Sequence, residues 1–205
     1  MAGRAPKNTG KDWIEAARRM LVDQGIASLK VDRLANRLGV TRGGFYHNFK
    51  DRDDFLDQVI MQWEESCRFL PEDALPAKPE AALGWLDGLT TRLIEADGYD
   101  FKFDLAVREW ARVDKRAEWA VERVDRERLD TLLKFFQLIG YDADHAAVRA
   151  RVFYYHQIGY YTIDVCQSIA ERRQSAQLYI EILCGEDVLA AANGTGKPGA
   201  LIRYG

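Results

Sequence analysis

Apolar residues recur every three or four positions along most of this sequence, a spacing that places them on one face of an α-helix. In the first part of the chain this pattern predicts helices over 12–24, 31–38, 42–47 and about 51–70. Gly25 and Gly39 are suited to end the first two helices, and Thr41 is suited to cap the third. The fourth opens at Asp51 with further acidic residues that complement its N-terminal dipole.

Three prolines, Pro71, Pro76 and Pro79, then interrupt the pattern. Beyond them it predicts helices over 80–96, 101–113, 116–139, 143–173 and 175–192. No segment alternates with the two-residue period of a strand, so the expected fold class is all-α with nine helices. The tail from 193 to 205 lacks apolar periodicity and is expected to be flexible.

Residues 152–163 are apolar or aromatic nearly all the way round the predicted helix. Such a helix must be covered on more than one side, by the core of its own domain and, most simply, by a second subunit. Gly159 lies in the middle of this segment, where it suits a close helix crossing. The pattern therefore predicts a homodimer.

Charge is unevenly divided along the chain, although the net charge is only −3. Residues 1–50 hold ten Lys and Arg against four Asp and Glu, and the remaining residues hold nineteen against twenty-eight. A basic N-terminal segment followed by an acidic remainder indicates that residues 1–50 bind an anionic partner.

The segment 31–50 carries the pattern most specific to a function. An amphipathic helix is followed by Gly39, which permits a left-handed turn, and by a short helix with few long side chains at its start. This is the helix-turn-helix pattern, whose second helix enters the DNA major groove. Phe45 is suited to pack the short helix on the first, whereas Gly43 and Gly44 let the backbone approach a duplex.

Over about residues 12–60 the chain resembles the tetracycline-repressor (TetR) family. The matching positions are Leu34-Ala35, Gly39-Val40-Thr41, Gly43, Phe45-Tyr46, Phe49 and Arg52-Asp53. Asn48 and Arg52 replace the histidine and lysine usual in the family, and both keep hydrogen-bonding capacity. The expected DNA-contacting set is Lys30, Arg33, Thr41, Arg42, Gly43, Gly44, Tyr46, His47 and Lys50.

The resemblance implies a division of labour along the chain. It predicts a DNA-binding domain over 1–50 and a helical ligand-sensing and dimerisation domain over 51–192. The last two long helices would pair with those of a second subunit, and the dimer would bind a palindromic DNA operator. A small-molecule effector would shift the helix opening at Asp51 and release a repressor from the operator.

Aromatic residues dominate the candidate effector pocket, which indicates an apolar or aromatic effector. The expected lining is Trp63, Trp85, Phe103, Trp110, Tyr155, His156 and Tyr160. Aromatic stripes at helical spacing are, however, more often plain core. His156 lacks a companion ligand at metal spacing, so neither a metal site nor a cofactor is expected.

Two alternatives to a ligand-responsive repressor remain open. One is a DNA-binding regulator without a small-molecule ligand. The other is a helical hydrolase using His156 with Asp164 or Cys166, although no nucleophile motif is present and the chain is expected not to be an enzyme. Three widely spaced cysteines and the absence of a long apolar run favour a cytoplasmic protein without a membrane span.

Overall fold

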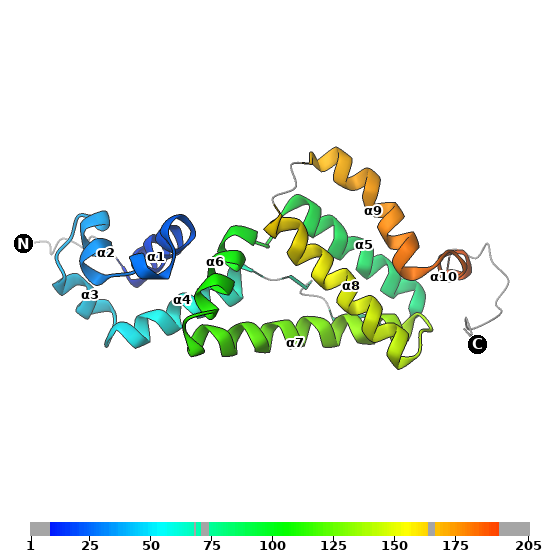
Figure 1. Cartoon of the computed structure of the whole chain (residues 1–205), viewed down its shortest axis with the longest axis horizontal. Helices are drawn as coiled ribbons and strands as arrows, with labels where there is room; N and C mark the ends of the chain where they lie inside the picture. Colours follow the sequence, from blue (N-terminus) through cyan, green and yellow to red (C-terminus); the bar gives the residue numbers. More distant parts are fainter. Residues whose placement is uncertain (1–8, 68, 71–73, 164–166, 193–205) are drawn as a thin grey trace, which may run out of the picture. The chain divides into compact units, whose positions relative to one another are not determined.

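The computed structural model describes residues 9–67, 69–70, 74–163 and 167–192, except for the side chains of 191 and 192. Its regular structure over these residues is helical, as the sequence predicts (Figure 1). The helices are α1 (Gly10–Gln24), the 3₁₀ turn η1 (Ile26–Ser28), α2 (Val31–Leu38), α3 (Gly43–Asn48), α4 (Arg52–Ser66), α5 (Pro79–Glu95), α6 (Phe101–Ala111), α7 (Lys115–Leu138), α8 (Ala143–Thr162), α9 (Ile169–Cys184) and α10 (Glu186–Ala192). Pro71, Asp164, Cys166 and the tail after 192, for which the sequence makes predictions, lie outside the described residues.

The predicted helix over 143–173 is wrong, because α8 ends at Thr162 and α9 begins at Ile169. A capping box starts α9: the Ser168 hydroxyl accepts from the amide of Glu171, whose carboxylate in turn accepts from the Ser168 amide at 2.7 Å. The helix expected over 175–192 is also divided, since Gly185 ends α9 at a φ of 78° and α10 follows. Apolar periodicity continues across both breaks and therefore conceals them.

A smaller correction concerns the start of α3. This helix begins at Gly43, and its N-cap residue is Arg42 rather than Thr41. The backbone carbonyl of Thr41 accepts from the Gly44 amide at 3.0 Å. Its hydroxyl is therefore not used as the cap of the helix.

Contacts between residues group the chain into two compact units. The first contains α1 to α4, α6 and residues 115–123 of α7, and the second contains α5, α8 to α10 and residues 124–138 of α7. All of α4 belongs to the first unit, and α7 has residues in both. The functional boundary expected near residue 50 concerns roles rather than contacts, and it stays a prediction.

The first unit is built around aromatic side chains. Phe45 of α3 is fully buried, and its ring lies 5.1–5.5 Å from those of Trp13, Phe49 and Phe55. These contacts fasten the short helix α3 to α1 and to the beginning of α4. A six-residue helix is not stable on its own, and the burial of these four large rings stabilises it in the folded protein.

Helices α4 and α6 are joined inside the same unit by a buried polar contact. The indole N–H of Trp63 donates to Asp104 at 2.9 Å, and the Arg108 guanidinium lies 2.8 Å from the other oxygen of that carboxylate. Asp104 is fully buried, so these partners supply the hydrogen bonds that water cannot give its carboxylate. The hydrogen bond between Trp63 and Asp104 fixes the position of α4 along α6.

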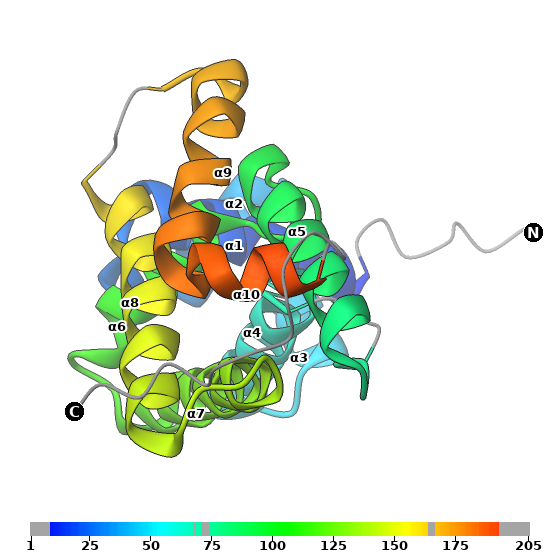
Figure 2. The same cartoon turned by 90° about the vertical axis from the view of Figure 1, so that its right-hand side faces the viewer.

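In the second unit, α5 packs against α9 and α10 (Figure 2). Trp85 of α5 stacks on Phe135 of α7 with ring centroids 6.0 Å apart. The hydroxyl of Tyr161 in α8 donates to the Leu93 carbonyl of α5, and the Tyr154 hydroxyl accepts from Arg128 at 3.1 Å. These bonds hold α8 between α5 and α7.

Across the described part of the chain, no helix combines the length and the apolar character that crossing a membrane requires.

Candidate nucleic-acid interface and helical cavity

The turn between α2 and α3 has the geometry that the sequence predicts. Gly39 adopts the left-handed conformation, with a φ of 66° and a ψ of 35°, and the Val40 amide donates to the Ala35 carbonyl at 3.0 Å. A residue with a side chain is strained at this φ, which explains the glycine. The turn directs α3 away from α2 at the point where the chain leaves the first helix of the motif.

Helix α3 has one apolar face and one polar face. Phe45 is fully buried, as predicted, and Phe49 is nearly so, whereas Tyr46 is 57% exposed. Of the nine expected DNA-contacting residues, eight are exposed: Lys30, Arg33, Thr41, Arg42, Gly43, Tyr46, His47 and Lys50. The ninth, Gly44, is partly buried. The structure thus exposes eight of the nine residues, which belong to α3, to its flanking positions and to the start of α2.

The two glycines at the start of α3 face different surroundings. A Cβ added at Gly43 would meet only the Thr41 hydroxyl oxygen, at 3.6 Å. A Cβ added at Gly44 would contact the Trp13 indole at 3.5 Å and Val40 at 3.9 Å. Gly43 is therefore the glycine that leaves the outer surface open, and Gly44 lies against the interior.

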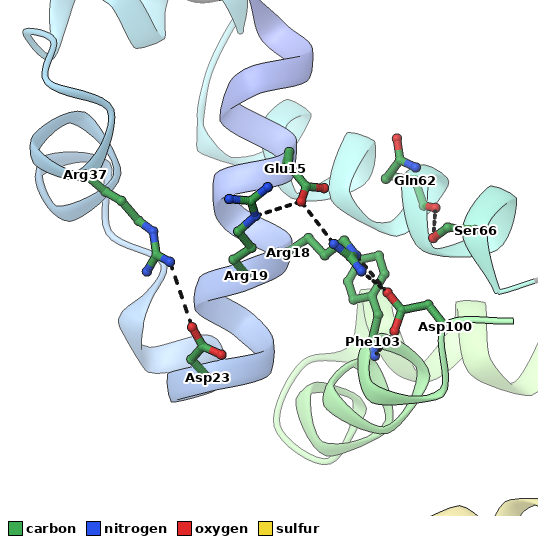
Figure 3. Close-up of polar contacts among 9 residues, drawn as sticks. All are labelled: Glu15, Arg18, Arg19, Asp23, Arg37, Gln62, Ser66, Asp100 and Phe103. Atoms are coloured by element: carbon green, nitrogen blue, oxygen red, sulfur yellow. Dashed lines mark hydrogen bonds and ion pairs between the residues drawn. The ribbon is translucent and has the colours of Figure 1, made fainter. Parts of the chain in front are cut away.

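Exposed ion pairs border this surface. Arg42 lies 3.1 Å from Asp32 of α2, and Arg37 lies 3.8 Å from Asp23 of α1 (Figure 3 draws the second pair). Exposed pairs are weak, so a phosphate group can displace Asp32 from Arg42 at little cost. Asn48, which departs from the family pattern, donates to the Gly44 carbonyl at 2.7 Å and so turns back onto its own helix.

The chain leaves α3 through a tightly bonded turn into α4. Asp51 caps α4 by accepting from the Asp54 amide at 2.9 Å, and Asp54 accepts from the Lys50 amide at 2.9 Å. Hydrogen bonds from the Gln58 side chain and from the Lys50 amide lower the pKa of Asp54. The backbone of Lys50 is thereby fixed while its side chain remains exposed.

An ion pair behind the helix-turn-helix was not expected from the sequence. Arg18 of α1 donates through Nε to Asp100 at 2.8 Å, and it also bonds Glu15 at 3.0 Å (Figure 3). Asp100 in turn caps α6 by accepting from the Phe103 amide at 3.1 Å. Burial lowers the pKa of Arg18, but bonding to Asp100 and the charges of both acids outweigh it, so the pKa is raised.

No sequence pattern near Arg18 predicts this contact, because Asp100 lies 82 positions away in the sequence. The contact is made where the N-terminus of α6 meets α1. It ties the helix that supports the helix-turn-helix to α6.

The seven aromatic and histidine residues expected to line one pocket are dispersed. Trp63, Phe103 and Trp110 are fully buried in the first compact unit, and the other four belong to the second. Within the second unit, Trp85 stacks on Phe135 and Tyr155 is exposed. The structure brings together two of the seven, His156 and Tyr160, which line a common cavity.

This cavity lies between α5, α8 and α9 of the second unit. It offers about 40 Å³ to the centres of water-sized molecules. Its walls are mostly apolar and aromatic, with a few polar side chains. They are formed by Thr90, Ile94, Phe153, His156, Gln157, Tyr160, Gln167, Arg172, Ser175, Ala176, Tyr179, Ile180 and Leu183. The α9 residues were not expected in this lining, because the last two long helices were expected to pair with a second subunit.

Arg172 is the charged group of the cavity wall. Its guanidinium lies 4.4 Å from the centre of the Tyr160 ring and donates to the Ile94 carbonyl at 3.0 Å. Burial, reinforced by the nearby charge of Arg172, lowers the pKa of His156. The imidazole is therefore neutral at neutral pH, and its ring lies 4.5 Å from that of Tyr179.

Sequence comparison finds relatives for the N-terminal part of the chain. The family described as "Bacterial regulatory proteins, tetR family" matches residues 14–59. The HTH-type transcriptional regulator AcrR of Shigella flexneri is 33% identical over 60 residues, 29% of this chain and 26% of that protein. The HTH-type transcriptional repressor AcnR of Corynebacterium glutamicum is 26% identical over 121 residues, 58% of this chain and 60% of that protein. The chain thus spans less than two thirds of these curated relatives.

Structural comparison extends the similarity to the whole fold. A crystal structure of a TetR-family transcriptional regulator from Marinobacter aquaeolei VT8 covers 93% of this chain and 100% of that chain, with a TM-score of 0.61 and 14% sequence identity. At this identity the match concerns the fold. Residues 14–59 thus match the helix-turn-helix segment of the tetR family of bacterial regulatory proteins, and the all-α fold is similar to that of a TetR-family regulator.

Proposed function

We propose that this protein is a sequence-specific DNA-binding transcriptional regulator that acts as a repressor. The observation that carries the proposal is the two-faced helix α3, which buries Phe45 and Phe49 and exposes Tyr46 and His47. Arg42 and Lys50 add positive charge at its two ends. In a helix-turn-helix protein such a surface reads base edges with its first residues and contacts phosphates with its flanks.

Residue roles follow from chemistry and position. Arg42 is suited to bind a guanine edge or a phosphate, and Lys50 a phosphate. Gly43 leaves the backbone open to the duplex, and Thr41 offers a hydroxyl to a phosphate. Lys30 and Arg33 provide flanking phosphate contacts. Repression is the output we assign, in keeping with the Corynebacterium glutamicum relative, which is a transcriptional repressor.

We further propose that the protein acts as a homodimer through α8 and α9. Val148, Val152 and Tyr155 share one face of α8, Ile163 continues this face at the C-cap of the helix, and each of the four residues is more than half exposed. Gly159 lies on the same stripe, and a Cβ added there would meet nothing within 4 Å among the described residues. An apolar stripe with an open glycine suits the close approach of a partner helix. Two copies would present two α3 helices to a palindromic operator.

An effector that lowers operator affinity is the third part of the proposal. It is supported by the cavity among α5, α8 and α9, which has apolar walls and a few polar groups. A tenfold loss of operator affinity requires the effector to favour the non-binding state by about 1.4 kcal/mol. A DNA-binding regulator without a ligand is the alternative, and it predicts unchanged operator affinity with every compound that binds this cavity.

Selection from randomised double-stranded DNA tests the DNA-binding function. The wild-type protein should retain a common sequence after several rounds, and retention should be lost in Arg42→Ala. Arg112→Ala is the matched control, because Arg112 is another exposed arginine of the first unit that pairs with an acidic neighbour, Glu109. Enrichment of no sequence, or equal retention by both variants, would overturn the proposal.

A further inference from the structure

The cavity between α5, α8 and α9 has flat aromatic walls. The rings of His156 and Tyr179 lie 4.5 Å apart, and those of His156 and Tyr160 lie 6.3 Å apart. Phe153 adds a further ring to the lining. Rings at these separations contact one another and form a continuous aromatic wall, against which a planar apolar ring gains offset-stacked or edge-to-face contacts.

The charge in the cavity wall is not balanced by an acid. Among the described residues that line the cavity, Arg172 is the cation and there is no Asp or Glu. The hydrogen bonds of Arg172 go to uncharged acceptors, the Ile94 carbonyl at 3.0 Å and the Tyr161 hydroxyl at 3.3 Å. The next residue, Arg173, instead forms an ion pair with Glu95. A partly buried guanidinium with neutral partners favours a bound carboxylate, which can accept two parallel hydrogen bonds.

The size of the cavity restricts the ligand. A single water needs roughly 10–15 Å³ on the measure that gives this cavity about 40 Å³, so its present space holds a few waters. An engineered cavity that binds benzene measures roughly 150 Å³, so a single aromatic ring enters here only if lining side chains move, and a fused ring system requires a still larger rearrangement. Gln157 and Ser175 in the lining supply hydrogen-bonding groups for a substituent on the ring.

We propose that the cavity binds a small single-ring aromatic carboxylate, with its carboxylate on Arg172 and its ring against His156, Tyr160 and Tyr179. The inference rests on the proposed function in one respect: it supplies the chemical class of the effector. It also makes the cavity selective, since an uncharged ring leaves the guanidinium without an anion and an aliphatic anion leaves the aromatic walls without a partner.

Calorimetric titration of the full chain without DNA tests the assignment. The probes are benzoate, 2-hydroxybenzoate and 4-hydroxybenzoate, each compared with its amide, which has nearly the same shape and no charge. At least one carboxylate should bind tenfold or more tightly than its amide and should raise the thermal unfolding midpoint. Binding of none of the three acids, or equal binding of acids and amides, would overturn the proposal.

Two adjacent arginine variants locate the anion. Arg172→Gln should weaken binding of the acid at least tenfold and leave binding of the amide unchanged. Arg173→Gln is the matched control and should bind the acid like the wild type. Equal losses in both variants, or full binding in Arg172→Gln, would contradict the role of Arg172. Because Arg172 also bonds α5, the comparison of acid with amide in the wild-type protein provides a test that needs no variant.

Failure of this inference is separable from failure of the DNA-binding function. Operator binding is measured on the selected duplex in the absence of any acid. A protein that binds the duplex but no aromatic acid overturns the cavity assignment alone. A protein that binds the acid but no duplex leaves the assignment standing and overturns the proposed regulator.

Discussion

Helix α3 and helix α8 are both rich in aromatic residues, but the segments that bury their rings differ. In α3, Phe45 and Phe49 are buried against α1 and α4, which are close in the sequence, while Tyr46 faces outward. In α8, the burial of its rings depends on packing against α5 and α9. A motif can therefore define the outer surface of α3, whereas the cavity of the second unit depends on long-range packing.

The buried face of α3 gives the largest expected effect. Phe45→Ala removes the ring that contacts Trp13, Phe49 and Phe55, so the free energy of unfolding should fall by about 3–5 kcal/mol. Urea denaturation followed by tryptophan fluorescence measures this loss. A change below 1 kcal/mol would mean that α3 is not held by its aromatic face.

The outer face of the same helix should respond in the opposite way. Tyr46→Ala should change the unfolding free energy by less than about 0.5 kcal/mol. It should weaken binding to the selected duplex by about 1–3 kcal/mol, because the exposed ring lies on the proposed contact surface. Trp119→Ala, which removes another exposed aromatic side chain of the first unit, is the control and should leave DNA affinity unchanged. Similar DNA affinities for the two variants would contradict the proposed surface.

The Arg18–Asp100 pair tests a long-range contact inside the first unit. A double-mutant cycle with Arg18→Met and Asp100→Asn should give a coupling energy on the order of 1 kcal/mol, reduced by partial solvent screening. Asparagine keeps an oxygen that can cap α6, so the cycle isolates the ion pair from the cap. Coupling no larger than that of the exposed Arg19–Glu15 pair would show that the contact does not join α1 to α6 energetically.

The smallest expected effect concerns the pair that holds Arg42. Asp32→Asn releases the guanidinium and removes a negative charge beside the proposed DNA surface, so affinity for any duplex should rise about two- to fivefold. Fluorescence anisotropy with labelled duplexes measures the change. Asp23→Asn frees Arg37 in the same manner and serves as the control, since Arg37 is outside the proposed contact set. An equal rise in DNA affinity in both variants would mean that the effect comes from the change in net charge and not from the release of Arg42.

The two regions also differ in how far the sequence predicts them. Helices α1 to α7 follow from apolar periodicity because a glycine, a proline or a capping residue stands at most of their ends. The boundary between α8 and α9 was missed, although Ser168 and Glu171 carry the capping-box spacing, because apolar residues continue across it. The contact surface of α3 was predicted from the segment 39–50, because its residues are close to one another in space as well as in sequence.

The cavity was predicted only in part, through His156 and Tyr160. Tryptophans such as Trp63 are placed by partners that no local pattern reveals, in this case Asp104 on another helix. Arg172 was not anticipated because its role depends on α5 and α8 lying against α9. Residues whose surroundings come from distant segments require the structure.

The most direct test of DNA recognition by α3 is a footprint of the protein on its selected duplex, with the Arg42→Ala/Tyr46→Ala double variant alongside. The wild-type protein should protect two half-sites whose centres lie one helical turn, about 34–36 Å, or a multiple of it apart, and the double variant should protect neither. Equal protection by the double variant, or no localised protection by the wild-type protein, would contradict the claim that α3 reads DNA.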